Sequence, residues 1–137
     1  MHLCFDTNVI LDVILRREPF IKESAMVVAL AEVSAHTGLL CATTLTNLHY
    51  VTRRTLGEAG ARQAIANFLQ VMELAKVTRY VLDAAVKSDM TDFEDAVLAY
   101  SAHQAGAQAI ITRNLKDFAQ SPVRAYTPTQ FLALQAL

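Results

Sequence analysis

The sequence has few cysteines and no long apolar run, and each shortage excludes a class of protein. Cys4 and Cys41 are the only cysteines. Their number and spacing do not resemble a zinc site, and both lie in apolar runs, so we expect them to act as small buried hydrophobic residues. The longest apolar stretch, 26–31, is far shorter than the about 20 residues that cross a bilayer. No charged-then-apolar segment at the start indicates export, so we expect a cytoplasmic protein with no membrane contact.

An excess of charge of either sign is also missing. The 12 Lys and Arg residues nearly balance the 13 Asp and Glu residues, which gives a formal net charge of −1. Such a chain has no overall field that would recruit nucleic acid, so any contact with nucleic acid depends on a local basic patch. This balance argues against tight nonspecific binding of DNA.

The composition that remains is ample for one hydrophobic core. Of the 137 residues, 53% are apolar, and this length is typical of one domain. No low-complexity linker or internal repeat divides the chain. We therefore expect residues 1–137 to form a single domain.

Short apolar runs alternate with longer segments of helical periodicity. Strands are predicted at the run before Asp6 and over 39–42, 75–78, 109–112 and 123–126, and helices over 9–15, 20–36, 45–56, 58–74, 80–88, 92–105 and from 127 onward. Gly38, Gly57 and Gly106 are expected to end helices, and Thr43 or Thr44, Asp92 and Thr127 are expected to cap them, with Pro128 as the first residue of the last helix. Parallel strands need crossovers that cover the sheet. The order predicts an α/β fold with a parallel sheet of four or five strands and helices on both faces.

Carboxylates follow the predicted strands at three places. Asp6 follows the first strand, Asp92 and Asp95 open the helix before the fourth strand, and Asp117 comes shortly after that strand. The carboxyl ends of parallel strands lie along one edge of the sheet, where ligands bind. Helical spacing turns Asp95 inward and Glu94 outward. We therefore expect these acids to converge at one edge.

An inward carboxylate must be paired or must bind a metal ion. No Lys or Arg lies one turn from Asp95 on its own helix, whereas Asp92 has the simpler alternative role of a helix cap. Magnesium suits an open site of this kind, because it takes one or two carboxylates and keeps several waters. Such an ion supports phosphoryl chemistry. The four histidines show no ligand spacing.

Three segments together resemble the PIN-domain family, in particular its bacterial VapC-like toxins. They are Phe5-Asp6-Thr7-Asn8 with Ile10-Leu11-Asp12, then Asp92-Phe93-Glu94-Asp95-Ala96, then Ile111-Thr112-Arg113-Asn114-Leu115-Lys116-Asp117-Phe118. The resemblance covers nearly the whole chain. It implies a compact three-layer nuclease-like fold whose acids bind Mg²⁺ or Mn²⁺ for cleavage of RNA phosphodiester bonds. Many bacterial members are the toxins of toxin–antitoxin pairs, usually homodimers that a small antitoxin protein neutralises.

The resemblance also assigns roles by position. Asp6 matches the first metal-binding acid of the family and Asp95 the third. The second acid falls near Asn47 and the fourth at Asn114, with Asp117 one turn further on. An Asn can offer a carbonyl oxygen to a metal or water, but it carries no charge and cannot act as a general base.

The reduced acidic set lowers the expected metal affinity. Asp92 and Asp117 are the candidates for supplying the missing charge, so we assign the metal to Asp6, Asp95, Asp92 and Asp117. Asn47 and Asn114 complete the candidate catalytic set. Weak activity, a different metal arrangement and loss of catalysis with retained binding all remain open.

Polar and basic residues near these acids are candidates for contacting substrate: Asn8, Arg54, Arg113 and Lys116. Asn47, Tyr50 and Arg54 share one helix face, with Arg53 alongside. Tyr50 is placed to stack on a base. The alternative for this face is ordinary solvation or a contact between two copies of the chain.

The leading hypothesis is a metal-dependent ribonuclease that acts as a toxin. The alternative is a PIN-like module that no longer cleaves RNA and instead binds RNA or a partner protein. Asn47 and Asn114 support this alternative. A third hypothesis makes Asp6 a phosphoryl acceptor, but the second Asp and the Lys that such folds use are missing, since Asn8 occupies the position of the former. Asp12 is expected to orient the first helix or to face solvent.

Overall fold

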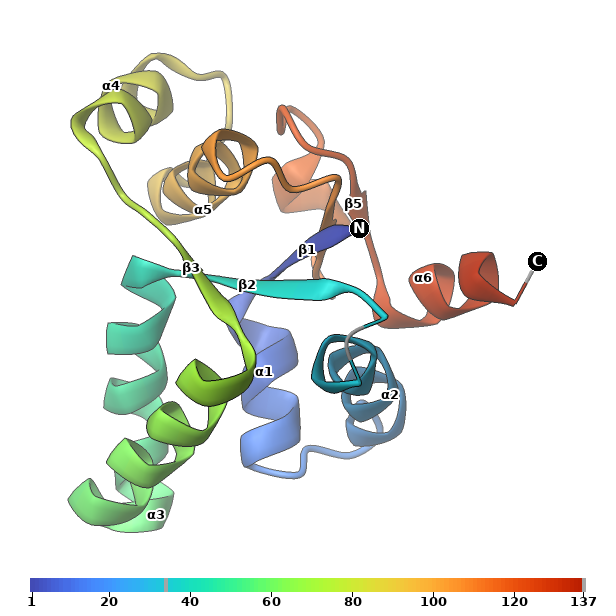
Figure 1. The fold of residues 1–137 in the computed structure, drawn as a ribbon. Helices are drawn as coiled ribbons and strands as arrows, with labels where there is room; N and C mark the ends of the chain where they lie inside the picture. The colour runs from blue at the N-terminus through green and yellow to red at the C-terminus, as the bar shows by residue number, and fades with distance from the viewer. Residues whose placement is uncertain (34, 137) are drawn as a thin grey trace.

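The computed structural model describes residues 1–33 and 35–136 and shows a parallel sheet between two layers of helices (Figure 1). The strands are β1 (His2–Phe5), β2 (Thr37–Cys41), β3 (Glu73–Ala75), β4 (Ala109–Ile111) and β5 (Ala125–Tyr126). Their order is β3-β2-β1-β4-β5, and every neighbouring pair is parallel. The predicted α/β architecture with a sheet of four or five parallel strands is confirmed.

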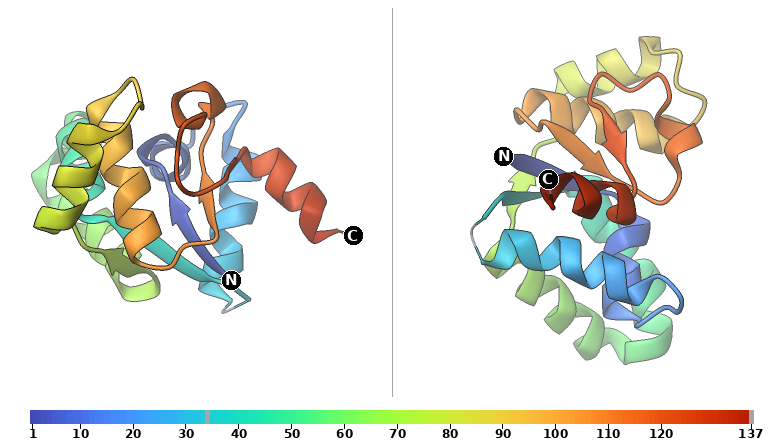
Figure 2. Two further views of the ribbon diagram at one scale, coloured as in Figure 1. Left: turned by 90° about the horizontal axis from the view of Figure 1, so that it is seen from above. Right: turned by 90° about the vertical axis from the view of Figure 1, so that its right-hand side faces the viewer.

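The helices divide between the two faces of the sheet, as Figures 1 and 2 show. One layer contains α1 (Thr7–Ile14), α2 (Ile21–Glu32), α3 (Ala42–Val71) and α6 (Pro128–Gln135). The other contains α4 (Arg79–Lys87), α5 (Phe93–Gln104) and the short 3-10 helix η1 (Leu115–Phe118). Among the helices of the described residues, none has the length and apolar content needed to cross a membrane.

Each face of the sheet has its own hydrophobic core because side chains alternate along a strand. In β1, Leu3 and Phe5 pack against the layer of α1 and α2, whereas Cys4 packs against the layer of α5. Cys41 is buried in the same core as Cys4, and both thiols are free. The expectation that the cysteines act as small hydrophobic residues is confirmed.

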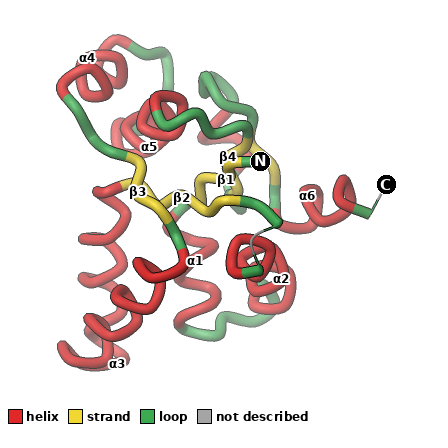
Figure 3. The backbone as a smooth tube through the Cα atoms, viewed as in Figure 1, coloured by secondary structure: helices red, strands yellow, loops and turns green. Residues whose placement is uncertain are grey.

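The element labelled α3 (Ala42–Val71) contains two helical segments separated at Gly57, whose backbone is non-helical with a φ of 74°. The prediction of two helices with a boundary at Gly57 is therefore confirmed. The strand predicted next, over 75–78, is shifted in the structure, where β3 is Glu73–Ala75. Figure 3 shows that the chain reverses direction within α3. Neither Thr43 nor Thr44 caps this helix, because Cys41 is the N-cap and β2 runs directly into α3.

Gly38 was expected to end α2, and this prediction is wrong. Gly38 lies inside β2, and α2 ends at Glu32. A side chain at position 38 would stand 2.9 Å from Ala31 Cβ and 3.0 Å from Met72 Cγ. The glycine is therefore required by the close approach of α2 and the end of α3 to the sheet. The helix predicted over 20–36 also included Ser34, which lies outside the described residues.

The predicted capping residues of α5 and α6 agree with the structure. Asp92 caps α5 by accepting a hydrogen bond from the Asp95 backbone N–H at 2.9 Å. Gly106 follows α5 with a φ of 80°. Thr127 caps α6 in a capping box with Gln130, and Pro128 is the first residue of that helix.

The register of β1 against β4 decides what meets at the carboxyl edge. Phe5 pairs with Ile111, so the next residues along the two strands, Asp6 and Thr112, lie side by side. The Asp6 backbone N–H also donates to the Ile111 carbonyl at 2.9 Å. This edge, bordered by the starts of α1, α3 and α5, is where the candidate site lies.

Candidate active site

Asp6 is a buried carboxylate held by neutral donors. Its Oδ1 accepts a hydrogen bond from the Thr7 backbone N–H at 2.8 Å, and its Oδ2 accepts one from the Thr112 hydroxyl at 2.8 Å. Asp6 is 7% exposed, and burial raises its pKa above the ordinary value, with a further increase from Glu94 and Asp117. The two hydrogen bonds act in the opposite direction because they stabilise the charged form.

Asp95 is the acid whose charge is most disfavoured. Burial, together with the negative charges of Asp6, Asp92, Asp117 and Glu94, raises its pKa to about 7. No ion pair among residues 1–33 and 35–136 includes Asp95. The inward orientation predicted for Asp95 agrees with its partial burial, and Glu94 is exposed as expected.

The two supplementary acids lie within electrostatic range of Asp95 but in different surroundings. Asp92 is exposed, and one of its oxygens is the helix cap described above. Asp117 is half-buried in η1 and raises the pKa of both Asp6 and Asp95. The tertiary structure therefore brings all four predicted acids to one edge of the sheet.

The donor set fits an open cation site better than a closed cage. Within the part of the chain that the structure describes, no group of three or more His, Cys, Asp or Glu side chains is already placed to hold a metal ion. Magnesium needs only one or two carboxylates, with water filling the remaining positions. The mutual repulsion of Asp6 and Asp95 is the kind of imbalance that a divalent cation relieves. The residues present fit Mg²⁺ or Mn²⁺ at Asp6 and Asp95.

The two asparagines occupy different borders of this edge. Asn47 is half-buried on α3 and lines a hollow of about 330 Å³ together with Phe93 and Glu94 of α5. Asn114 is exposed at the start of η1, and its backbone N–H donates to the Thr112 hydroxyl at 3.0 Å. Asn114 is therefore linked to Asp6 through Thr112, whereas Asn47 shares a hollow with the first turn of α5.

The candidate substrate-binding residues have diverse surroundings. Lys116 is exposed on η1, and Asn8 accepts a hydrogen bond from the Arg113 backbone N–H at 3.4 Å. Arg54 donates to the Tyr50 hydroxyl at 3.0 Å, and its guanidinium lies 5.1 Å from the centre of the Tyr50 ring. Tyr50 is 55% exposed. The predicted basic and aromatic face of α3 therefore exists, on the surface.

Arg113 has a structural partner that sequence reasoning did not find. Its Nε and Nη2 donate to the Asp12 carboxylate at 2.8 and 3.2 Å, and its guanidinium lies 3.8 Å from the centre of the Phe20 ring. Asp12 is fully buried and also accepts from the Ser24 hydroxyl at 3.1 Å. Of the two roles expected for Asp12, facing solvent is wrong, whereas its contacts from α1 to Arg113 and Ser24 agree with a role in orienting the first helix. Arg113 joins the loop after β4 to α1 and α2.

Thr112 is the other residue that sequence reasoning missed. It is fully buried, donates to Asp6 and accepts from the Asn114 backbone, so it orients the central carboxylate. A signal was present in the sequence, because Thr112 follows the apolar run of β4 as Asp6 follows that of β1. Polar residues at equivalent strand ends become neighbours in a parallel sheet.

Comparison with solved structures finds the same architecture in bacterial toxin–antitoxin systems. VapBC2 from Rickettsia felis, bound to a promoter DNA fragment, has a TM-score of 0.71 at 16% identity and covers 93% of this chain and 98% of its own. A toxin–antitoxin complex from Klebsiella pneumoniae has a TM-score of 0.69 at 20% identity, with 92% and 97% covered. VapC20 from Mycobacterium tuberculosis, described as a sarcin-ricin loop cleaving toxin, has a TM-score of 0.64 at 17% identity, with 79% and 86% covered.

These identities are low enough that the likeness concerns the fold alone. No curated protein sequence matches the chain significantly. The sequence profile of the PIN domain matches residues 2–116, a stretch that contains Asp6, Asp95 and the whole of the acidic edge except Asp117. This chain therefore belongs to the PIN domain family.

Proposed function

We propose that this protein is a divalent-metal-dependent endoribonuclease and the toxin of a toxin–antitoxin pair. The observation that carries the proposal is the convergence of acids at the carboxyl edge of the sheet. Burial and the negative charges of Asp6, Asp92, Asp117 and Glu94 raise the pKa of Asp95 to about 7. Structural carboxylates are usually neutralised by a nearby cation, whereas perturbed acids that share an edge are typical of functional sites.

The residues of the site would divide the work between holding a cation and contacting RNA. Asp6 and Asp95 would bind Mg²⁺ or Mn²⁺, and Asp92 and Asp117 would add negative charge around it. A bound ion of this kind activates water as a nucleophile and neutralises charge on the attacked phosphate. Thr112 and the Thr7 backbone N–H fix the direction of the Asp6 carboxylate.

Contacts to the RNA backbone would come from exposed cations on the elements that start at the edge. Lys116 is exposed on η1, and Arg54 is exposed on α3, about three turns after its start. Arg113 contributes less to such contacts, because its guanidinium already neutralises Asp12. Tyr50 supplies an exposed ring beside Arg54 for stacking on a base.

Cleavage of a mixed RNA pool with Mg²⁺ or Mn²⁺ tests the proposal directly. We expect cleavage by the wild type and a loss of at least about 100-fold in Asp6→Asn and in Asp95→Asn, because a metal contributes several kcal/mol to phosphoryl transfer. Asp83→Asn is the matched control, since Asp83 is an exposed acid on α4. Equal rates of RNA cleavage for the wild type and Asp6→Asn would contradict the proposal.

A second candidate function is a PIN-like module that binds RNA or a partner protein without cleaving RNA. Asn47 and Asn114 favour this alternative, because each carries no charge at a position where the family pattern has an acid. Calorimetric titration with Mn²⁺ separates the two functions. Binding that disappears in Asp95→Asn supports the nuclease, whereas no measurable binding supports the module.

The partners of a toxin would be an antitoxin protein and a second copy of the chain. Several of the solved structures with this fold are toxin–antitoxin complexes. The layer of α4 and α5 exposes large apolar side chains, among them Tyr80, Val86 and Phe93. Light scattering of the purified protein and co-purification with the product of a neighbouring small gene test these two partners.

A further inference from the structure

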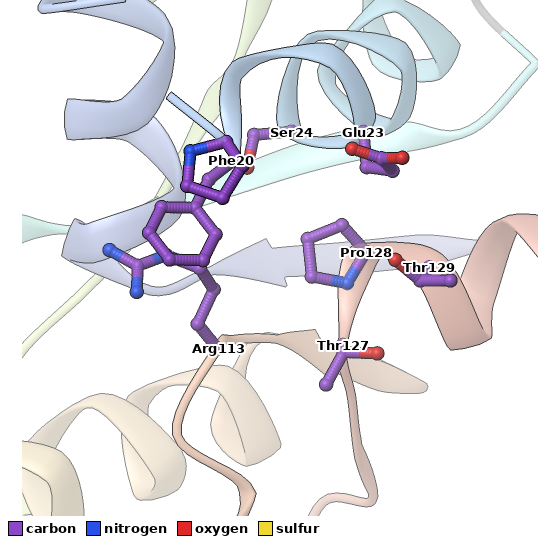
Figure 4. A pocket seen from close by; sticks show the side chains of 8 residues that line it. Phe20, Glu23, Ser24, Arg113, Thr127, Pro128 and Thr129 are labelled. Atoms are coloured by element: carbon purple, nitrogen blue, oxygen red, sulfur yellow. The ribbon is translucent and has the colours of Figure 1, made fainter. Parts of the chain in front are cut away.

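A second hollow lies at the carboxyl edge of the sheet, between Arg113 and the starts of α2 and α6. It has a volume of about 370 Å³ and takes its walls from the chain before α2, the first turn of α2, Arg113 and the start of α6. Figure 4 shows Phe20 and Arg113 at one side and Pro128 and Thr129 at the other, with Glu23 above. This size is at the lower end of small-ligand pockets.

The hollow adjoins the acidic site through the backbone. Arg113 follows Thr112, whose hydroxyl donates to Asp6 at 2.8 Å. The Arg113 backbone N–H is also bound by Asn8, which is in the first turn of α1. If one phosphate of an RNA strand lies at Asp6, the adjacent nucleotide of that strand is close enough to reach this hollow.

The walls of the hollow are formed before any ligand binds. Arg113 is fixed by two hydrogen bonds to Asp12 and by the Phe20 ring 3.8 Å away. Pro128 is buried, and Thr127 is held in the capping box of α6. A ligand that enters a preformed site loses less free energy to ordering of the protein.

The charge of the walls decides which part of a nucleotide fits. Asp12 neutralises the Arg113 guanidinium, whereas no hydrogen bond or ion pair within residues 1–33 and 35–136 engages the Glu23 carboxylate. The hollow therefore carries one uncompensated negative charge, which repels phosphate. A free carboxylate accepts hydrogen bonds from N–H groups, and these are found on base edges.

We propose that this hollow binds the base of an RNA nucleotide beside the cleaved bond, with Glu23 accepting hydrogen bonds from the base edge. The proposal rests on the proposed ribonuclease function. Guanine fits best, because its ring N–H and exocyclic amino group are adjacent donors that match the two oxygens of a carboxylate. Thr129, which Figure 4 shows below Glu23, also lines the hollow.

Titration of the isotope-labelled full chain with guanosine, inosine or uridine tests the pocket without requiring cleavage. Guanosine is expected to shift the backbone amide signals of Ser24 and Thr129. Inosine lacks the exocyclic amino group and is expected to bind roughly ten- to hundredfold more weakly, the usual effect of losing one hydrogen bond to a charged group. Glu23→Gln should abolish the preference for guanosine, whereas Glu32→Gln, an exposed acid at the other end of α2, should retain it.

Sequencing the ends of cleaved RNA supplies the second measurement. The wild type is expected to prefer guanine at one position beside the cut, and Glu23→Gln is expected to lose that preference. If the wild type cleaves RNA without a preference for guanine, and guanosine causes no shifts at Ser24 or Thr129, the proposed base binding is overturned but the nuclease function is not. No cleavage by the wild type would overturn the nuclease, and the nucleoside titration would still decide whether the hollow binds a base.

Discussion

Asp6 and Asp12 lie six residues apart at α1, and both carboxylates are buried, yet their partners differ. Asp12 is fully buried and accepts from a guanidinium at 2.8 and 3.2 Å and from the Ser24 hydroxyl at 3.1 Å. Asp6 is 7% exposed, and within residues 1–33 and 35–136 it accepts from a backbone N–H and the Thr112 hydroxyl, both at 2.8 Å. Among these residues Asp12 therefore has a cationic partner, whereas Asp6 has none.

The difference separates a structural acid from a candidate functional one. A buried charge is tolerated when it is paired and hydrogen-bonded, and Asp12 satisfies both conditions. Asp6 is hydrogen-bonded but not paired, and the nearby Glu94 and Asp117 raise its pKa further. A site of this kind gains from a cation supplied from outside the chain.

The largest expected effect comes from removing the cation beside Asp12. Arg113→Met leaves the Asp12 charge buried and unpaired, and we expect a loss of about 3–5 kcal/mol in the free energy of unfolding. Urea denaturation measures this loss. Arg124→Met is the control, since Arg124 lies over the Tyr126 ring at 5.4 Å and belongs to no ion pair among the described residues. Equal losses in the two variants would contradict a structural role for the Asp12 pair.

The same substitution at the two acids sharpens the comparison. Asp12→Asn weakens hydrogen bonds to a charged partner, and we expect a loss of about 1.5–3 kcal/mol. Asp6→Asn retains a good helix cap but loses the acceptor for the Thr112 hydroxyl. Removing a charge that burial disfavours offsets this loss, so its free energy of unfolding should change by less than about 1 kcal/mol. Both are measured by denaturation in the presence of a chelator. A larger loss in Asp6→Asn than in Asp12→Asn would reverse our assignment of the two acids.

A smaller effect is expected from the hydroxyl that orients Asp6. Thr112→Val keeps the shape of the side chain but removes the donor to Asp6 and the acceptor for the Asn114 N–H. We expect a loss of about 1–2 kcal/mol in the free energy of unfolding and a further rise in the pKa of Asp6. Carboxyl carbon NMR measures this pKa. Thr52→Val is the control, because the Thr52 hydroxyl is equally buried but donates to a helix carbonyl. An unchanged pKa of Asp6 would show that Thr112 does not stabilise its charge.

The smallest effect concerns pH and thermal stability. The pKa of Asp95 is raised in the folded chain to about 7, so the folded state binds a proton more tightly than the unfolded state does. The resulting stability is fully present below about pH 4, the unfolded pKa, and is lost as the pH rises through 7. Without metal, the melting temperature should fall by a few degrees between pH 5 and pH 8. Asp95→Asn should remove most of this decrease, and Mg²⁺ should oppose it in the wild type. A wild-type decrease that persists in Asp95→Asn would assign it to another group.

Local patterns were most reliable where one residue type decides a local geometry. Asp92 and Thr127 cap their helices as predicted, because a short polar side chain there accepts from the N–H groups of the first turn. Gly57 was correctly predicted to separate two helices, because its positive φ interrupts the helical backbone. Gly38 misled the prediction because the space around it is limited by Ala31 and by Met72, and Met72 is distant in the sequence.

The sequence by itself determined the alternation of strands and helices, the two-sided burial of the sheet and the candidate status of Asp6 and Asp95. These follow from periodicity and from the rule that parallel strands end at one edge. Only the tertiary structure decided which partners neutralise or orient each acid. The partner of Asp12 is 101 residues away in the sequence and the hydroxyl that orients Asp6 is 106 away. Burial and charge depend on neighbours brought together by the register of β1 and β4, which no local pattern encodes.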